Sequence, residues 1–301
     1  MRERPHRRPR RFRPRHLQVV RDEAISVVDA NTVHPERVRR RAAEDPVGAA
    51  LMAEFVESLS SNPFSRSQVM CAVRGDDLLG LCLMAGNMVP LGLPAEAFGP
   101  VAEHVRRRSL RFSSMVGPAE EVMGLWRLLR RHLGGARDIR PDQPSLMIDH
   151  EPHIDADPLV RPGRLEDLEI LIPACVAMFT EEVGYSPLSA GGGYERRIRN
   201  LVEQGRSLVR IEDGPGGPEV VFKAEIGTVG LGAAQVQGVW VNPRRRGQGL
   251  AAPGMAAVVE HTRAMFAPIV SLYVNSYNTA ALATYERTGF RQVGTFATIL
   301  L

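Results

Sequence analysis

The chain has 301 residues, a length that suits two domains of ordinary size, each with its own hydrophobic core. Its hydrophobic content of 44% is typical of globular proteins, and no apolar run has the length of a membrane span, which excludes an integral membrane protein. The net charge of +4 is unevenly spread: residues 1–16 hold eight arginines and one glutamate, so this segment carries +7 and the remaining residues carry −3.

Residues 1–16 are interpreted as a basic, disordered arm. Such an arm can steer a protein to nucleic acid or to an anionic surface. No folded basic face with interleaved aromatic residues accompanies it, so a nucleic-acid partner is disfavoured. The arm also lacks the apolar centre of a signal peptide, and the three cysteines show no paired spacing. We therefore expect buried free thiols, no metal site and a cytoplasmic location.

Residues 17–150 are predicted to form a first domain. The expected elements, in chain order, are a mostly helical segment over 35–59, a hairpin of strands 68–73 and 78–85, a helix over 95–108, a strand over 110–116 and an apolar helix opened by Gly117-Pro118. The prolines at positions 141, 144, 152, 158 and 162 then interrupt any long helix. We interpret this proline-rich stretch as the passage to a second domain, residues 155–301.

The second domain is predicted to continue with alternating helices and strands. The expected order is a helix through 168–179, a helix over 194–204, a hairpin of strands 207–212 and 220–227, a strand over 234–241, a helix over 252–266, a strand over 269–274, a helix over 279–287 and a final hairpin that ends at residue 301. The glycines of residues 191–193 give the loop before the second helix freedom to move.

A glycine- and arginine-rich turn follows the strand over 234–241. It reads Arg246-Gly247-Gln248-Gly249-Leu250-Ala251-Ala252 and leads directly into a helix. Glycines allow the backbone to aim several N–H groups at one point, the helix N-terminus adds its positive dipole, and Arg246 can add charge-assisted hydrogen bonds. The pattern therefore predicts a pyrophosphate site for a nucleotide-type cofactor.

Two other phosphate-binding motifs fit these residues less well. Gly247-x-Gly249-x-x-Ala252 matches the dinucleotide fingerprint, but the next strand ends in Asn275 without the acidic residue that binds ribose. Only about fifty residues follow the turn, too few for the remaining strands of a doubly wound sheet. No Gly-Lys-Ser/Thr follows the glycines, which excludes a P-loop.

The turn resembles the phosphate loop of the GNAT family of acyl-CoA-dependent N-acyltransferases, Arg/Gln-x-x-Gly-x-Gly/Ala. A second segment, from Asn278 to Phe290, has Asn, Ala, Tyr and Gly-Phe at the spacing of that family's other signature. The resemblance covers roughly residues 158–301, and the chain is also similar to an actinobacterial subgroup with an extra N-terminal domain. It implies an α+β fold of tandem GNAT-like domains, with a mixed, mostly antiparallel sheet flanked by helices and with the C-terminal copy complete.

The resemblance implies an acetyl-CoA site. In this family the strand before the loop bulges and splays from its neighbour, so that free backbone groups meet the pantetheine arm. Tyr285 matches the general acid that protonates the departing CoA thiolate, although it can also be a core tyrosine on an amphipathic helix. Carried over to this sequence, the cofactor-binding residues are Val239, Trp240, Val241, Arg246, Gly247, Gln248, Gly249, Leu250, Ala251, Ala252, Asn278, Ala281 and Tyr285.

The acceptor amine must lose a proton before it attacks the thioester. Glu225 is the candidate general base because it is a lone acid in an apolar strand; a salt bridge to Lys223 or to a nearby arginine is the equal alternative. Glu181 and Glu182 could bind a cationic substrate. Gln235 and Gln237 alternate with apolar residues in the splayed strand and could hydrogen-bond the acceptor.

The predicted function is acetyl-CoA-dependent transfer of an acetyl group to a primary amine of a small molecule or peptide, by direct attack in a ternary complex. The alternatives are a non-catalytic CoA-sensing or scaffold protein and, less favoured, a nucleic-acid-associated factor. In the first domain the turn over 113–118 lacks the Arg-x-x-Gly-x-Gly pattern, and Pro118 removes one N–H group. We therefore expect this domain to be a degenerate copy that binds no cofactor.

Overall fold

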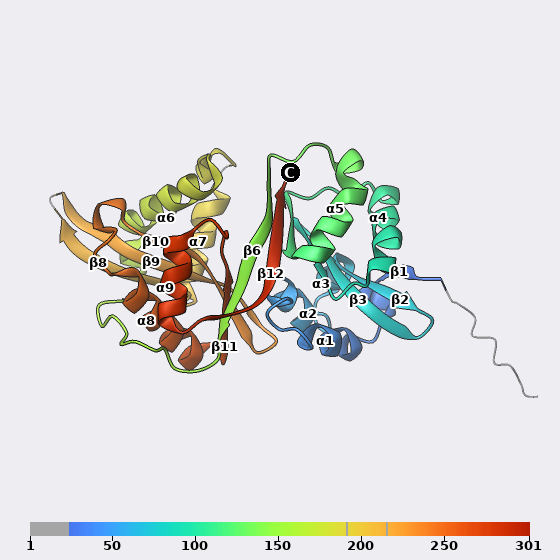
Figure 1. Ribbon diagram of the computed structural model, residues 1–301, viewed down its shortest axis with the longest axis horizontal. Coiled ribbons are helices and arrows are strands. Elements are labelled where there is room, and N and C mark those ends of the chain that lie inside the picture. Colours follow the sequence, from blue (N-terminus) through green and yellow to red (C-terminus); the bar gives the residue numbers. More distant parts are fainter. Residues whose placement is uncertain (1–23, 191, 215) are drawn as a thin grey trace, which may run out of the picture.

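One twelve-stranded sheet runs through the whole molecule in the computed structural model (Figure 1), which describes residues 24–190, 192–214 and 216–301. The predicted arm of residues 1–16 and the first glycine of the 191–193 run lie outside the described residues. The strand order is β1-β2-β3-β4-β5-β12-β6-β11-β10-β9-β8-β7. Among the described strands only β4–β5 and β10–β11 pair in parallel. The predicted α+β class, with a mixed and mostly antiparallel sheet flanked by helices, is confirmed.

We call residues 24–150 the N-terminal half. Its elements are β1 (Ser26–Asp29), α1 (Pro35–Ala43), α2 (Ala53–Glu57), α3 (Pro63–Gln68), β2 (Val69–Arg74), β3 (Asp77–Met84), β4 (Asn87–Leu91), α4 (Phe98–Arg107), β5 (Ser114–Pro118), α5 (Ala119–Leu133) and β6 (Asp138–Ile148). The prediction that residues 35–59 are mostly helical is confirmed, but the helix is not continuous. A turn closed by the Asp45 side chain, which accepts from the Gly48 N–H at 2.8 Å, separates α1 from α2, and Pro46 cannot continue α1.

We call residues 155–301 the C-terminal half. Its elements are β7 (Arg161–Pro162), α6 (Leu168–Val183), α7 (Gly193–Glu203), β8 (Ser207–Gly214), β9 (Gly217–Gly230), β10 (Ala233–Val241), α8 (Ala251–Met265), β11 (Ile269–Tyr273), α9 (Thr279–Thr288) and β12 (Arg291–Leu300). The order β10-α8-β11-α9-β12 repeats the order β4-α4-β5-α5-β6 of the N-terminal half. Within the described part of the chain, no helix combines the length and the apolar character that a membrane span requires.

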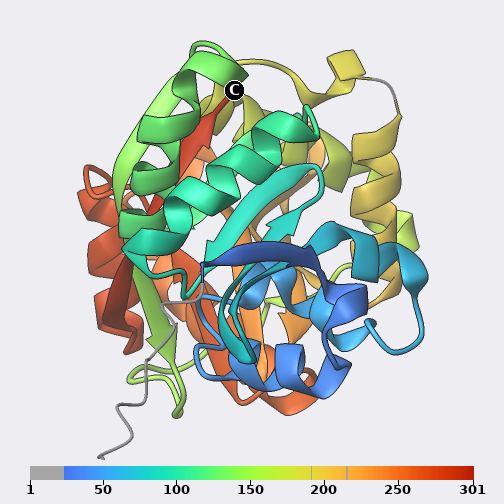
Figure 2. The same ribbon diagram turned by 90° about the vertical axis from the view of Figure 1, so that its right-hand side faces the viewer.

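The last strand of each half is built into the sheet of the other half. β6 pairs with β11 and β12, and β12 pairs with β5 and β6, all in antiparallel register. In Figure 1 these two strands, green and red, lie side by side at the centre of the molecule, and Figure 2 shows the end of β12 beside α5. The predicted final hairpin is therefore wrong, because residues 291–300 form one long strand.

β6 occupies residues that the proline pattern assigns to a linker. Pro141 falls between Arg140 and Gln143, where the pairing of β6 with β12 shifts register, so its missing N–H interrupts no regular ladder. Pro144 still offers its carbonyl, which accepts from the Val274 N–H at 3.1 Å. Prolines are thus tolerated inside a central strand because one lies at a bulge and the other acts as an acceptor.

The strand exchange also shares the hydrophobic cores. Ala297 and Ile299 of β12 are buried against α4 and α5 of the N-terminal half. Leu146 and Ile148 of β6 are buried with side chains of β11, α8 and α9 in the C-terminal half. A fragment of residues 155–301 would therefore lose part of its core and expose the edge of β11.

Candidate active site

The parallel strands β10 and β11 separate well before β10 reaches the loop motif. Their pairing is confined to residues 233–235 of β10 and 269–271 of β11, although β10 continues to Val241. On its other edge β10 pairs with β9 through a register shift between Gln237 and Trp240, where Gly238 has a φ of 59°. The strand therefore bulges and splays, which leaves backbone groups of residues 236–241 facing the gap beyond the end of the β11 ladder.

The turn after β10 has the backbone conformation of an anion cradle. Gly247 and Gly249 have φ values of 77° and 78°, which residues other than glycine rarely adopt. A Cβ at either position would meet open space. α8 starts at Ala251, so its N-terminus adds free N–H groups and a positive dipole. Among the described residues, none accepts a hydrogen bond from the backbone N–H of Gly247 or Gly249.

Arg246 at this turn is held by the acidic end of α6. Its guanidinium donates to the Val241 carbonyl at 3.1 Å and to the Glu181 carboxylate at 2.6 Å. The same carboxylate accepts from the Trp240 indole N–H at 3.3 Å. Glu181, predicted to bind the substrate, therefore lies against two residues predicted to bind the cofactor.

The second motif places Asn278 at the start of α9 and Tyr285 inside the core. The Asn278 side chain caps the helix by accepting from the Ala281 N–H at 3.2 Å. Tyr285 is buried and packs edge-on against Phe290, with ring centroids 5.7 Å apart. Burial, with a smaller contribution from the charge of Glu182, raises the pKa of Tyr285 above its usual value. The phenol is therefore protonated at neutral pH, as a proton donor must be.

Glu225 and Lys223 form a buried ion pair beside the bulge, and the partly exposed Arg197 joins it. The Glu225 carboxylate accepts from Lys223 Nζ at 2.8 Å and from Arg197 at 3.2 Å, and Cys175 Sγ lies 3.5 Å away. Burial raises the pKa of Glu225, but the cations Lys223 and Arg197 outweigh burial and hold it below its ordinary value. Lys223 also donates to the Gly238 carbonyl at 2.9 Å, so the cluster holds the bulge in place. The salt bridge considered for Glu225 is present.

Comparison with known proteins identifies the C-terminal half. Residues 209–290 match the model of the acetyltransferase (GNAT) family. This segment belongs to the GNAT family. Residues 67–171 match a domain of unknown function (DUF4081), a range that crosses the predicted domain boundary at residues 150–155. Comparison with curated protein sequences gives no match.

Solved GNAT structures resemble nearly the whole chain in fold. A GCN5-related N-acetyltransferase from Sphaerobacter thermophilus has a TM-score of 0.56 at 16% identity, covering 93% of this chain and 95% of its own. An acetyltransferase of the GNAT family from Colwellia psychrerythraea has a TM-score of 0.54 at 14% identity, covering 92% of this chain and 98% of its own. The likeness therefore extends over both halves and not only over the residues that match the GNAT model.

The GNAT loop of the C-terminal half has its structural counterpart after β4, not at the predicted turn over 113–118. β4 is parallel to β5 and leads through residues 92–97 into α4, as β10 leads through the phosphate loop into α8. Residues 114–118 instead form β5, the counterpart of β11. The sequence placed the degenerate loop one strand too late, because the strand in 87–91 carries neither a glycine pair nor an arginine after it.

An internal carboxylate occupies this N-terminal loop. Glu121, in the first turn of α5, accepts from the backbone N–H groups of Gly92 at 3.0 Å and Leu93 at 2.9 Å. Burial raises the pKa of Glu121 to about 7, while the two N–H groups and Arg41 act in the opposite direction. Counted from the helix start, Leu125 of α5 stands where α9 has Tyr285. The N-terminal half therefore has neither an open anion loop nor the tyrosine.

Sequence reasoning missed the residues that β6 brings to the GNAT site. Arg140 donates to the Glu182 backbone carbonyl at 2.9 Å and lies 3.5 Å from its carboxylate. Glu182 in turn is one of the charges that raise the pKa of Tyr285. Only the recognition of residues 138–148 as a strand beside β11 would have revealed this contact.

The remaining predicted residues divide between this region and the core. Gln235 is buried within β10, opposite Ser271 of β11, whereas Gln237 is half-buried and lies against Gly227 of β9.

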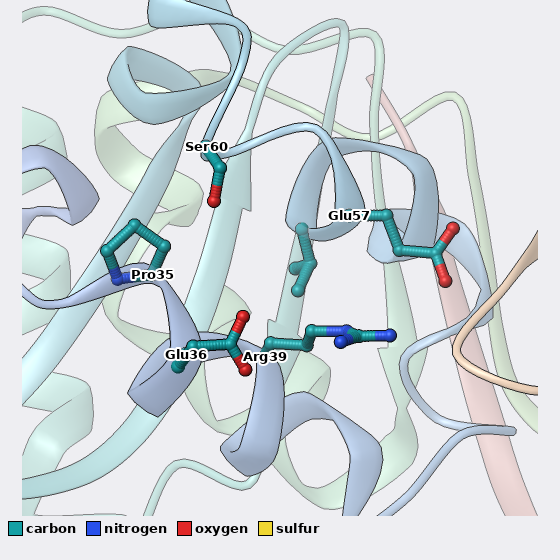
Figure 3. A pocket seen from close by; sticks show the side chains of 6 residues that line it. Pro35, Glu36, Arg39, Glu57 and Ser60 are labelled. Atoms are coloured by element: carbon teal, nitrogen blue, oxygen red, sulfur yellow. The ribbon is translucent and has the colours of Figure 1, made fainter.

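A separate hollow of about 280 Å³ opens between α1 and α2 in the N-terminal half (Figure 3). Glu36 and Arg39 face Glu57 and Ser60 across it, and it contains none of the predicted site residues.

Proposed function

We propose that the chain is an acetyl-CoA-dependent N-acetyltransferase that transfers an acetyl group to a primary amine by direct attack in a ternary complex. The observation that carries this proposal is the combination of a bulged, splayed β10 with a two-glycine turn at the N-terminus of α8. In this proposal residues 155–301 form the catalytic GNAT unit and residues 17–150 a GNAT-like unit without a cofactor.

The phosphate loop and β10 would hold the cofactor. The N–H groups of Gly247 to Ala252 and the Arg246 side chain would bind the pyrophosphate, which requires Arg246 to exchange its contact with Glu181 for the ligand. The backbone of Val239, Trp240 and Val241, on the edge of β10 that β11 no longer pairs with, would bind the pantetheine arm and polarise the thioester carbonyl. Asn278 and Ala281 would close over the cofactor at the start of α9.

Tyr285 and Glu182 would perform the proton transfers. The protonated phenol of Tyr285 donates to the departing CoA thiolate. Glu182, whose side chain is 54% exposed, is the carboxylate that an incoming ammonium meets, and it takes the proton directly or through water. Both oxygens of Glu225 are engaged by cations, so we assign it to support of the bulge and not to proton removal.

The test is thiol release from acetyl-CoA across a panel that contains a monoamine, a polyamine, an amino acid amide and a peptide N-terminus. We expect acetyl-CoA to bind at one site per chain and at least one amine to accelerate thiol release. A chain that binds acetyl-CoA but releases no thiol with any amine would instead support a CoA-sensing or scaffold protein. A chain that binds no acetyl-CoA contradicts both functions.

A further inference from the structure

The strand β6 comes from the N-terminal half but borders the loop that leads into α9. The Val274 N–H donates to the Pro144 carbonyl at 3.1 Å, and the Ser276 N–H donates to the Asp142 carbonyl at 3.3 Å. This loop continues directly to Asn278, the cap of α9. The path of the backbone before α9 is therefore set by a strand that lies about 130 residues earlier in the chain.

Gln143 supplies the side-chain part of this contact. Its amide is 3% exposed, donates from Nε2 to Asn275 Oδ1 at 2.9 Å and accepts from Thr298 Oγ1 at 2.6 Å. A buried amide is costly unless its donors and acceptors are paired, so the two bonds together fix the Asn275 side chain against β6 and β12. Among the described hydrogen bonds, the side chain of Asn275 bonds to Gln143 alone.

A second side chain of β6, Arg140, contacts the end of α6. Arg140 is 11% exposed and bonds to both the backbone and the carboxylate of Glu182 at the end of α6. β6 thus touches the loop before α9 through Gln143 and the end of α6 through Arg140. The loop leads into α9, which carries Tyr285, and the end of α6 carries Glu182; these two side chains are the groups assigned to the proton transfers.

We propose that Gln143 is a positioning residue for the acyl-CoA site, and that the N-terminal half completes this site by lending it the strand β6. The inference rests on the proposed function, because it assigns acetyl-CoA to the C-terminal loop. Gln143 acts through Asn275: the bond holds the loop that sets the position of Asn278 and the start of α9.

The test measures acetyl-CoA affinity by calorimetry in the full chain. Gln143→Leu keeps the approximate size of the side chain but removes both bonds, and Asn275→Ala removes one partner at a half-buried loop position. We expect each variant to raise the acetyl-CoA Kd about tenfold, the size of one lost hydrogen bond. The double variant should be no weaker than the weaker single variant, because both changes remove the same contact.

Thr298→Val is the matched control, because it removes the other bond of Gln143 and leaves the bond to Asn275. It should lower the Tm but leave the acetyl-CoA Kd within twofold of the wild type. A folded Gln143→Leu or Asn275→Ala with wild-type affinity would overturn the inference, and so would equal weakening by Thr298→Val. If Gln143→Leu does not fold, Asn275→Ala decides alone. A wild-type chain that fails to bind acetyl-CoA would contradict the proposed function itself.

Discussion

Each half has a turn between the first strand of its parallel pair and the helix that follows. The two turns differ in whether a side chain of the protein itself binds the backbone N–H groups. In the N-terminal half the N–H groups of Gly92 and Leu93 bind the carboxylate of Glu121 from the next helix. In the C-terminal half a Cβ at Gly247 or Gly249 of the corresponding loop would meet open space, and Glu181 binds the Arg246 side chain instead of the loop backbone. An anion-binding turn is retained in both halves, but only one leaves it accessible to a ligand from solution.

A repeated fold can keep the structure of an anion-binding turn and lose its ligand when one side chain changes. Position 121 is the third residue of α5, and the third residue of α9 is Ala281. Glu121 reaches the turn that follows β4, whereas the alanine side chain of α9 is too short to reach the corresponding turn after β10. A single side chain therefore substitutes for the phosphate that the helix N-terminus would otherwise attract.

Tyr285→Phe should give α9 of the C-terminal half the apolar character that Leu125 gives to α5 of the N-terminal half. If the hydroxyl protonates the leaving thiolate, kcat should fall by about 10²–10⁴-fold, while the acetyl-CoA Kd changes little because the ring is kept. Turnover of the best amine in the panel and calorimetric affinity measure the two quantities. Wild-type turnover with chemistry rate-limiting would mean that another group donates the proton.

Gly249→Asp should reproduce in the C-terminal loop the internal carboxylate of the N-terminal loop. The new charge would lie among the N–H groups that bind the pyrophosphate, so acetyl-CoA affinity should fall by about 10²–10³-fold. Gly232→Asp is the matched control, because Gly232 has a φ of 79° and open space around it, as Gly249 has, but lies in the turn between β9 and β10. Equal losses in the two variants would mean that backbone strain, and not charge in the loop, causes the effect.

Glu121→Gln should reveal the titration of the carboxylate that fills the N-terminal loop. Burial raises the pKa of Glu121 from 4.5 to about 7, so as the pH rises between these values the unfolded chain ionises first and the folded state loses stability. Through this group the wild type should lose up to about 3 kcal/mol of unfolding free energy across that window, and Glu121→Gln should not. Denaturant unfolding at pH 5 and pH 8 measures the difference, and Glu120→Gln in the same helical turn is the control. Parallel changes in wild type and Glu121→Gln would show that groups other than Glu121 cause the pH dependence.

The sequence predicted the C-terminal site better than the N-terminal one for a physical reason. The phosphate loop and the α9 motif are local, since the glycines, the helix start and the Asn278 cap all lie within a few residues of one another. Glu225 also lies in a predicted strand, but its partners Lys223 and Arg197 only meet it through the fold. The structure shows the ion pair, which is one of the two interpretations of Glu225 that the sequence left open.

The strand exchange could not be predicted, because its signals are long-range. Two prolines in β6 suggest a linker, and only the bulge opposite β12 and the contact with Val274 make them compatible with a central strand. Likewise, Glu121 lies near Gly92 only because α5 packs behind the β4–β5 pair. Both features join residues that are far apart in the sequence, so neither leaves a periodic pattern.

Arg140→Met should separate what the exchanged strand does for the acceptor from what it does for the cofactor. Methionine keeps much of the length and the apolar stem of Arg140 but removes the bonds to Glu182, so the end of α6 loses one anchor. We expect the acceptor KM to rise about tenfold, as for the loss of one charged hydrogen bond, and the acetyl-CoA Kd to change less than twofold. Arg140→Lys should restore part of the acceptor KM, because an ammonium group can still reach the acidic end of α6. Arg108→Met, which breaks the exposed pair with Asp29 in the N-terminal half, should leave both constants unchanged. If Arg140→Met lowers only the Tm, β6 supports the fold of the C-terminal half without shaping its acceptor site.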